Sequence, residues 1–302
     1  MAPQDSETIS PDFPFEKRTA HVLGSSMAYI DVGVPSNIVT VFLHGNPASS
    51  YIWRNIIPYA SQHTRCIAPD LIGFGDSDKV AGLEYRVKDH QRFVDAFLDV
   101  LLPSQQVVLV LHDWGSVLGL DWARRNASRI AGLVLMEIII PRDWQEVSDT
   151  IRKTLETLRD PQAGRALIID QNILIEKLLA TGVVRDLAEE EMNAYRRPFM
   201  DPISREPLYR FRMEMPFGGQ PEDVWKKTKD CLEWLISNNT RKLFFWCTPG
   251  ITLKEVRAKE IIQQLRNTKA VCLGNGLHEV QEDHPHSIGR ELSDWLKNVV
   301  LF

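Results

Sequence analysis

The chain has 302 residues, of which 44% are hydrophobic and 25% are charged, and its formal net charge is −5. These values are ordinary for a globular protein. The mild acidity, and the lack of any block of lysines and arginines, argue against nucleic acid as a partner. The longest apolar run, Ile130 to Ile140, is interrupted by Glu137 and is far shorter than a membrane span. We therefore expect no contact with a membrane.

The first residues, Met1 to Thr8, are polar and acidic and lack the basic and apolar regions of a secretory signal. A cytoplasmic protein is the expectation. The four cysteines are scattered through the chain without a C-x-x-C motif. Three of them, Cys66, Cys247 and Cys272, lie in or beside strand-like runs, and we expect them to be reduced residues of the core.

In the first half of the chain, strands alternate with helices. Residues 17–22 and 27–32 are expected to form an antiparallel hairpin at the edge of a sheet. Buried strands are predicted at 38–43, 65–69, 107–111 and 130–136, and helices at 86–102 and 116–125. Alternation of this kind indicates a parallel sheet with right-handed crossovers.

The alternation stops between Pro141 and Pro216, where the sequence is charge-rich and punctuated by prolines. Helices are predicted in this segment at 144–159, 164–180 and 188–196. Afterwards the pattern resumes, with helices at 222–236, 253–265 and 285–299 and strands at 242–246 and 269–273. We therefore predict an α/β core with a mostly parallel eight-stranded sheet, formed by residues 1–140 and 217–302, and an inserted helical cap at 141–216.

One buried strand ends abruptly at a polar residue. The run from Val107 is aliphatic up to His112, and Asp113 is followed by an amphipathic helix. Gly115 stands where the chain must fold back, so the sequence predicts a tight strand-to-helix turn at Asp113. This is the layout of the nucleophile elbow of α/β-hydrolases, which presents one side chain above the sheet. Asp is also a favoured helix N-cap, and this motif alone leaves both interpretations open.

The strand at 38–43 ends in His44-Gly-Asn-Pro47. Gly45 permits a sharp bend, after which the N–H of Asn46 faces the space above the strand end. In α/β-hydrolases this loop gives one half of the oxyanion hole, and the residue after the nucleophile, here Trp114, gives the other half. Gly, Asn and Pro are also ordinary turn formers.

A nucleophilic Asp needs a base that later activates water, and a carboxylate that orients the base. His278 lies after the last predicted strand, where α/β-hydrolases carry the catalytic histidine. Glu137 ends the sixth strand, and burying it unpaired would be costly. We predict that it pairs with His278, the alternative being a strand-end Glu that reaches solvent. His44 and His112 are expected to be structural.

These motifs together resemble the haloalkane dehalogenases, in the branch with an Asp–His–Glu triad and an Asn–Trp halide pair. This family also includes Renilla-type luciferases. The resemblance runs from about Phe13 to the C-terminus and includes the cap. Each motif is weak alone, but the combination is specific. The matching segments are 44–54, 69–75, 112–115, 136–137, 168–172, 248–250 and 276–283.

The resemblance implies an α/β-hydrolase fold and the roles of five residues. Asp113 would be the nucleophile, His278 the base and Glu137 its orienting acid. The side-chain N–H groups of Asn46 and Trp114 would hold the departing halide, and their backbone N–H groups would form the oxyanion hole.

The implied reaction is the hydrolysis of a haloalkane to a primary alcohol, halide and a proton, through SN2 attack and a covalent alkyl-enzyme ester. No metal or organic cofactor is expected, and halide is bound only as a product. The expected partners are a small haloalkane and water. We expect a monomer or a weak dimer.

The resemblance also suggests residues that line the substrate pocket. Phe211 matches an aromatic residue that the family uses there, and Arg212 stands where relatives often have Pro. Arg212 either points away or alters the halide side of the pocket. Further candidates are Leu174, Leu178, Met215 and Leu277, and each could equally be packing within the cap.

Three other functions compete with dehalogenation. An epoxide hydrolase also uses an Asp nucleophile, but it needs two cap tyrosines, for which Tyr195 and Tyr209 are candidates. A coelenterazine-oxidising luciferase shares the fold and triad by descent. The third is a non-catalytic ligand-binding relative, against which the intact constellation argues, because an unused Asp beside a Glu is electrostatically unfavourable.

Overall fold

The computed structural model describes residues 8–300 and contains one eight-stranded sheet in the order β1-β2-β4-β3-β5-β6-β7-β8. β1 pairs antiparallel with β2, and β2 pairs antiparallel with β4, while the other neighbours are parallel. The mostly parallel sheet with an antiparallel edge hairpin is therefore confirmed. The strands are β1 (Lys17–Val22), β2 (Ser25–Gly33), β3 (Ile38–Leu43), β4 (Arg65–Pro69), β5 (Gln106–Asp113), β6 (Ile130–Ile138), β7 (Lys242–Pro249) and β8 (Thr268–Gly276).

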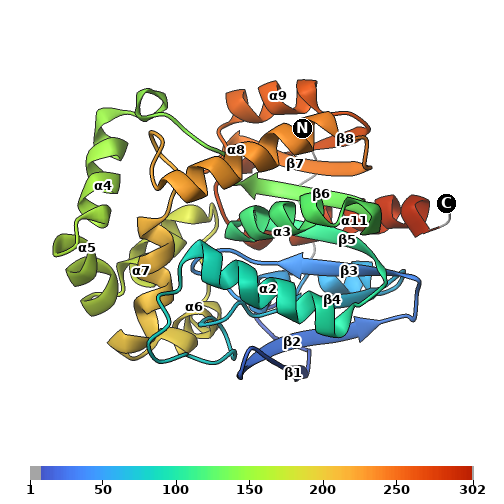
Figure 1. Cartoon of the computed structure of the whole chain (residues 1–302), viewed down its shortest axis with the longest axis horizontal. Helices are drawn as coiled ribbons and strands as arrows, with labels where there is room; N and C mark the ends of the chain where they lie inside the picture. The colour runs from blue at the N-terminus through green and yellow to red at the C-terminus, as the bar shows by residue number, and fades with distance from the viewer. Residues whose placement is uncertain (1–7, 301–302) are drawn as a thin grey trace.

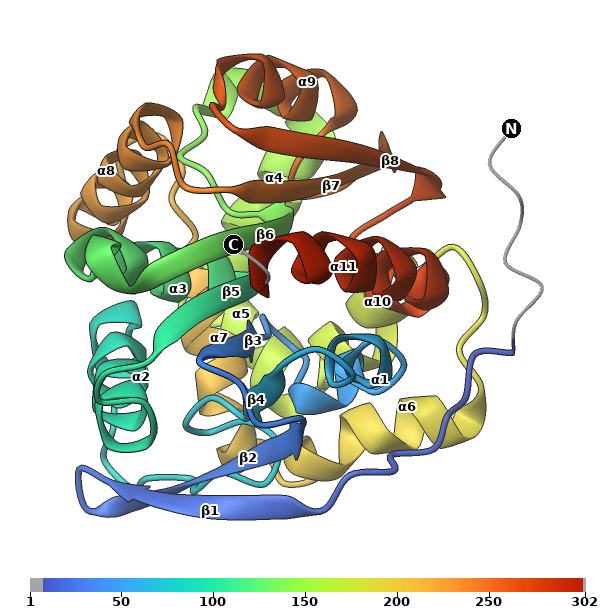
Figure 2. The same cartoon turned by 90° about the vertical axis from the view of Figure 1, so that its right-hand side faces the viewer.

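Helices cover both faces of this sheet, which explains why its central strands are apolar throughout. Figure 2 shows α2 (Val87–Leu101), α3 (Trp114–Arg125) and α8 (Glu222–Ser237) on one side and α1 (Ile57–Ala60) and α11 (Pro285–Val300) on the other. Every residue of β5 from Val107 onward is buried, as expected for a strand between two helical layers. α9 (Glu255–Gln264) packs against β7.

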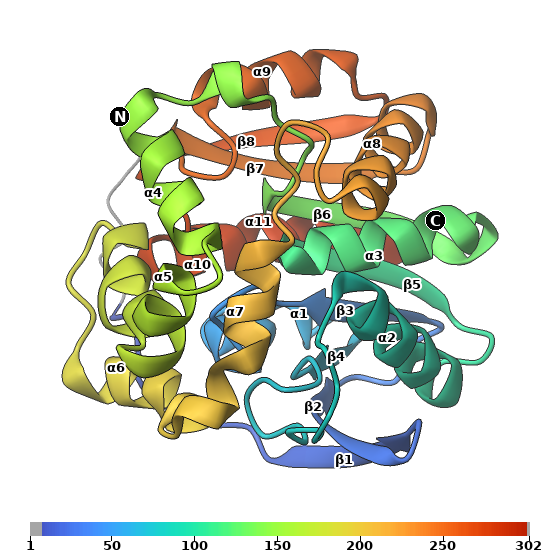
Figure 3. The same cartoon turned by 60° about the vertical axis from the view of Figure 1, so that its left-hand side comes forward.

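The segment between residues 141 and 216 forms a group of helices at one end of the sheet (Figures 1 and 3). These are α4 (Asp149–Arg159), α5 (Ala163–Arg165), α6 (Glu189–Arg196) and α7 (Glu206–Met213). The arrowheads of β3 and β6 point toward this group in Figure 1, so it lies over the carboxyl ends of the parallel strands. The boundaries of core and cap remain a prediction.

A single helix over 164–180 was the wrong expectation. α5 is one turn, π-helical segments follow at Ala166–Asp170 and Leu174–Leu179, and Asn172 between them has φ of 53°. Asn adopts this left-handed conformation more readily than most residues. The guanidinium of Arg205 donates to the carbonyls of Ile169 and Asp170, which replaces helical hydrogen bonds at this point.

Two further expectations need correction. The stretch predicted as one helix over 144–159 is divided, because α4 begins only after Ser148, whose hydroxyl caps Ile151. Cys272 is exposed, whereas Cys66 and Cys247 are buried. Cys272 sits on β8, the edge strand of the sheet, so one side of it lacks a neighbouring strand. α7 was not predicted at all.

No helix among residues 8–300 is long and apolar enough to span a membrane. Most of the N-terminal stretch that we expected to lack a secretory signal, residues 1–7, lies outside the described residues.

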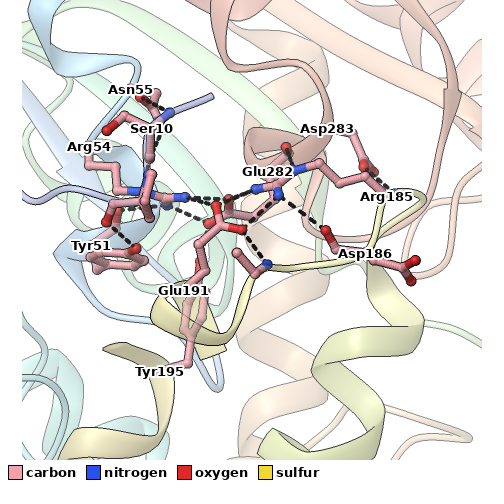
Figure 4. A network of polar contacts seen from close by, with 12 residues as sticks. Ser10, Tyr51, Arg54, Asn55, Arg185, Asp186, Glu191, Tyr195, Glu282 and Asp283 are labelled. Atoms are coloured by element: carbon pink, nitrogen blue, oxygen red, sulfur yellow. Dashed lines mark hydrogen bonds and ion pairs between the residues drawn. The ribbon is translucent and has the colours of Figure 1, made fainter. Parts of the chain in front are cut away.

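Buried charges join the cap segment to the core (Figure 4). Arg54 donates to Glu282 of α10 (Val280–Asp283) at 2.6 and 2.8 Å and to Glu191 of α6 at 2.6 Å. Arg185 adds hydrogen bonds to both carboxylates, at 2.6 and 2.7 Å. The Tyr195 hydroxyl donates to Glu282 as well. This set of residues, Arg54, Arg185, Glu191, Tyr195 and Glu282, is called the cap–core network below.

Candidate active site

Asp113 occupies a sharp turn between β5 and α3. Its φ and ψ are 47° and −124°, and its side chain makes no capping bond to α3. A Cβ at position 115 would lie 2.1 Å from the carbonyl oxygen of Leu43, and one at position 45 would lie 2.3 Å from Asp113 Oδ2. Glycine is therefore required on both sides of Asp113. The strained geometry and the missing cap favour the nucleophile elbow over a simple N-cap.

Two backbone N–H groups hold the Asp113 carboxylate. The N–H of Asn46 donates to Oδ2 at 2.9 Å, and the N–H of Trp114 also donates to this carboxylate. These are the two groups assigned to an oxyanion hole. In an ester formed on Asp113, the carbonyl oxygen is one of Asp113's own oxygens. The donors are therefore already in position for charge that develops there.

His278 bridges the other two carboxylates. Its Nε2 lies 3.7 Å from Asp113 Oδ1, and its Nδ1 lies 3.1 Å from Glu137 Oε2. Glu137 is 4% exposed, and its Oε2 accepts from the N–H groups of Ile251 at 3.2 Å and Thr252 at 2.8 Å. The fold thus brings Asp113, Glu137 and His278 together from the ends of β5, β6 and β8, with His278 between the two carboxylates.

The backbone of the His278 loop is fixed by the cap segment and the neighbouring strand. The N–H groups of His278 and Glu279 both donate to the carbonyl of Gly182, at 2.8 and 2.9 Å. The ring of His112 donates through Nε2 to the carbonyl of His278 at 3.0 Å. Burial holds the pKa of His112 well below its usual value, so its ring is neutral at neutral pH.

Glu279 follows His278 directly and was not predicted as a site residue. It is 1% exposed, its Oε2 has no hydrogen-bond partner, and this atom lies 3.9 Å from His112 Nε2. Burial raises the pKa of Glu279 to about 8. The only available signal was a charged residue beside the predicted base.

Burial and neighbouring charges shift the pKa of His278 in opposite directions. Burial lowers the pKa of His278, but the carboxylates of Glu279, Glu137 and Asp113 outweigh it and raise the pKa to about 10. Burial also raises the pKa of Asp113, against the charge of His278 and the two N–H donors. The neighbouring negative charges therefore favour the protonated form of His278 in the resting site.

Atoms of His112, His278 and Glu279 lie within 4.8 Å of one another, which is the one group among residues 8–300 that could hold a metal ion. The proton on His112 Nε2 is already used in the bond to the carbonyl of His278. A cation here would also occupy the histidine assigned as base. We therefore interpret this group as part of the electrostatics of His278.

The two predicted halide donors are both in contact with α7. Asn46 donates one N–H of its amide to the carbonyl of Leu208 at 3.2 Å, which leaves its second N–H available. The indole of Trp114 stacks on Phe211 with ring centroids 4.7 Å apart and planes 11° apart.

A cavity of about 160 Å³ opens above Asp113. Its size suits a small molecule of a few heavy atoms. Three of the predicted lining residues, Leu174, Leu178 and Met215, line it, and so does Arg212. Asn46, Asp113, Trp114, His278 and Glu279 also face it. Apolar walls with a few convergent polar groups are typical of a ligand site.

Two predicted lining residues do not line this cavity. Phe211 is completely buried behind the indole of Trp114. Leu277 precedes the base, and its carbonyl accepts from the thiol of Cys247. Both therefore support the site from behind.

Comparison with known proteins shows which families this chain is similar to. The family described as the alpha/beta hydrolase fold matches residues 39–285. A haloalkane dehalogenase of Mesorhizobium japonicum is 42% identical over 283 residues, covering 93% of this chain and 91% of its relative. One from Bradyrhizobium diazoefficiens is 39% identical over 303 residues, covering 96% and 97%.

Solved structures agree with these sequence matches. The haloalkane dehalogenase DbeA from Bradyrhizobium elkani superposes with a TM-score of 0.90 at 39% identity, covering 94% of this chain and 98% of that one. DatA from Agrobacterium tumefaciens gives 0.87 at 32% identity, covering 94% and 97%. The chain is thus an α/β-hydrolase by fold. Within that class it belongs to the haloalkane dehalogenase family.

Proposed function

We propose that this protein hydrolyses the carbon–halogen bond of small haloalkanes through a covalent ester on Asp113. The observation that carries the proposal is the position of the Asp113 carboxylate. One oxygen, Oδ2, is held by the N–H of Asn46, while Oδ1 faces His278 Nε2 at 3.7 Å. A carboxylate with one oxygen anchored and the other free in an enclosed cavity is suited to attack carbon.

In the first step, Oδ1 attacks the carbon that bears the halogen. The C–O bond forms as the C–X bond breaks, and halide leaves with the electron pair. The free N–H of the Asn46 amide and the indole N–H of Trp114 receive it. Charge-assisted hydrogen bonds of this kind offset part of the hydration that a halide loses in a buried site.

The ester makes Asp113 neutral, which changes the base. Asp113 is one of the carboxylates that raise the pKa of His278. When its charge is lost, the pKa of His278 falls and the imidazolium can release its proton. The first step therefore prepares the general base for the second.

In the second step, neutral His278 takes a proton from water, and the hydroxide attacks Cγ of the ester. The N–H groups of Asn46 and Trp114 stabilise the negative charge on Oδ2. On collapse, the imidazolium of His278 gives its proton to the leaving alkoxide oxygen, and the carboxylic acid left on Asp113 gives its proton to His278, so that the alcohol, the Asp113 carboxylate and the imidazolium result. Glu137 holds Nδ1 of His278 at 3.1 Å and stabilises the imidazolium.

The first test is bromide release from 1-bromobutane and 1,2-dibromoethane. The parent protein should release bromide, and Asp113→Asn should release none, because a neutral amide does not displace halide. A folded parent without bromide release would reject the proposed activity.

A second test traps the intermediate. His278→Phe should form the ester and fail to hydrolyse it, so the intact protein should gain the mass of the alkyl group after exposure to 1-bromobutane. No gain in mass on that variant would reject the covalent mechanism even if bromide is released.

Epoxide opening is the weaker alternative, because neither candidate tyrosine lines the cavity. The hydroxyl of Tyr195 donates to Glu282 in the cap–core network, and Tyr209 packs beneath the guanidinium of Arg165. Styrene oxide should therefore give no diol. Light emission with coelenterazine remains the check for a luciferase activity.

The proposed steps use only side chains, backbone donors and water. We therefore infer that no metal or organic cofactor takes part and that halide is bound solely as a product. Activity should be unchanged after dialysis against a chelator. A cytoplasmic monomer or weak dimer is the assembly we propose, and sedimentation of the purified protein tests the oligomeric state.

A further inference from the structure

Arg212 carries a positive charge into the active-site cavity without a partner. It lies on α7 and lines the cavity together with Asn46, Asp113 and Trp114. Its Nε is buried and has no hydrogen-bond partner. Within residues 8–300, no acceptor forms a hydrogen bond or an ion pair with its guanidinium. Arg212 is only partly exposed, so its charge has lost part of its water without gaining a protein partner, and an anion is expected to bind beside it.

The contacts of α7 place Arg212 on the halide side of the cavity. The residue before it, Phe211, stacks on Trp114 at 4.7 Å, and Leu208 one turn earlier accepts from the amide of Asn46 at 3.2 Å. Both predicted halide donors therefore touch the helix that carries Arg212. The apolar part of the cavity is formed mainly by Leu174, Leu178 and Leu179.

The charges around Arg212 change during the reaction. The carboxylate of Asp113 acts on Arg212 as an opposite charge, and the guanidinium of Arg159 acts against it. Attack on a haloalkane neutralises Asp113 and creates a halide ion. The negative charge thus passes from the carboxylate to the leaving group, and the halide becomes the counter-ion that Arg212 lacks.

We propose that Arg212 is a third component of the halide site, in addition to Asn46 and Trp114. This inference rests on the proposed function and deepens it. Coulomb attraction increases as ions approach more closely, so the guanidinium favours the smaller halide. Arg212 should therefore tighten halide binding, shift the preference of the site toward chloride, and slow the release of halide after turnover.

Direct halide binding tests this without turnover. Chloride and bromide are titrated against tryptophan fluorescence in the parent, Arg212→Met and Arg212→Lys, with Trp114→Phe to identify the signal from the site. Arg210→Met is the matched control, since Arg210 lies on the same helix and donates to the carbonyl of Glu84 outside the cavity. Thermal unfolding verifies that each variant is folded.

Arg212→Met should weaken halide binding by roughly tenfold or more, as expected for the loss of a charge-assisted contact. The loss should be larger for chloride than for bromide. Arg212→Lys should retain part of the affinity, and Arg210→Met should match the parent. Halide affinity within about twofold of the parent in Arg212→Met would overturn the proposal.

The rival occupant is a carboxylate on the substrate, which a guanidinium also binds well. The kcat/KM of each variant is therefore compared for 1-bromobutane and 4-bromobutanoate, which have the same carbon chain length. A halide role predicts parallel changes for both substrates. A loss confined to 4-bromobutanoate would overturn the halide role and assign Arg212 to the substrate.

The outcomes separate this inference from the proposed function. If halide binds in an Arg212-dependent way but no haloalkane is hydrolysed, the dehalogenase activity is wrong and the anion site stands. If haloalkanes are hydrolysed but halide affinity does not depend on Arg212, the activity stands and the role of Arg212 is wrong.

Discussion

Arg54 is buried in the protein and Arg212 is partly exposed in the active-site cavity, and their surroundings are opposite. Arg54 is 2% exposed, and its amino groups donate to Glu191 and Glu282, while its Nε donates to the carbonyl of Ser10 at 2.9 Å. Arg212 lines a cavity and donates to no residue between 8 and 300. The first guanidinium has its anions built into the fold. The second faces the cavity, where we propose that an anion from outside binds.

The paired arginine serves to position the site from a distance. Glu282 lies four residues after His278, and Glu191 lies on α6 of the cap segment. Through the cap–core network, Arg54 joins α6 to α10 (Figure 4), and α10 begins two residues after His278. A charge with all partners in place fixes structure, whereas a charge without one is available for binding and catalysis.

Arg54→Met should give the largest effect on stability. It leaves two buried carboxylates with only Arg185 as a cation, and breaking such a network costs about 3–5 kcal/mol. Urea unfolding should show this loss. Lys226→Met, which removes an exposed charge from a surface pair with Asp230, should change stability by less than about 1 kcal/mol. Equal effects in the two variants would show that the cap–core network adds nothing beyond a surface pair.

Arg212→Met should have the opposite effect on stability. Removing an unpaired charge and filling its volume with an apolar chain should stabilise the protein by about 1–2 kcal/mol, at the expense of halide affinity. Differential scanning calorimetry without halide measures this. Added chloride should narrow the difference, because it stabilises the parent more than the variant. A destabilised Arg212→Met would mean that Arg212 is a structural residue like Arg54.

The same contrast explains which parts of the molecule could be predicted from sequence. The strand before Asp113 is aliphatic and Gly115 follows it closely, so the local pattern predicted a turn at Asp113, although it left the N-cap interpretation open until the other motifs were considered. Glu137 was predictable because a carboxylate in an apolar run must find a partner. The order of strands and helices in the core followed from periodicity, whereas in the cap segment α7 was missed and two predicted helices are interrupted.

Contacts between distant residues were not predictable. Arg54 and Glu282 are 228 positions apart, and no spacing in the chain indicates their pairing. The apolar residues of 164–180 have helical spacing, which predicted a single helix. Asn172 and the carbonyl contacts of Arg205 interrupt that helix in the structure. The sequence showed that Arg212 stands where relatives often have Pro. The direction of its side chain depends on α7, which was not predicted.

Glu279 should give the smallest effect. Like Arg212, it is an ionisable residue with an unpartnered polar atom, but it lies beside the base His278. Its carboxylate is the largest favourable influence on the pKa of His278, which stands at about 10. Glu279→Gln removes that influence, so the pKa of His278 should fall. Burial raises the pKa of Glu279 to about 8, so this influence is present mainly above that pH. Because His278 acts as base only when neutral, the variant should there reach its full rate of ester hydrolysis at a lower pH than the parent.

The shift should appear in hydrolysis of the ester, measured in single-turnover experiments between pH 6 and 10, and leave the rate of bromide release in the first step nearly unchanged. We expect a displacement of about one pH unit or less, because Glu137 and water compensate part of the lost charge. Glu260→Gln, which removes one exposed charge on α9, provides the control for net charge. If the profile of Glu279→Gln coincides with that of the control, the Glu279 carboxyl is neutral throughout this range and its burial beside His278 serves packing alone.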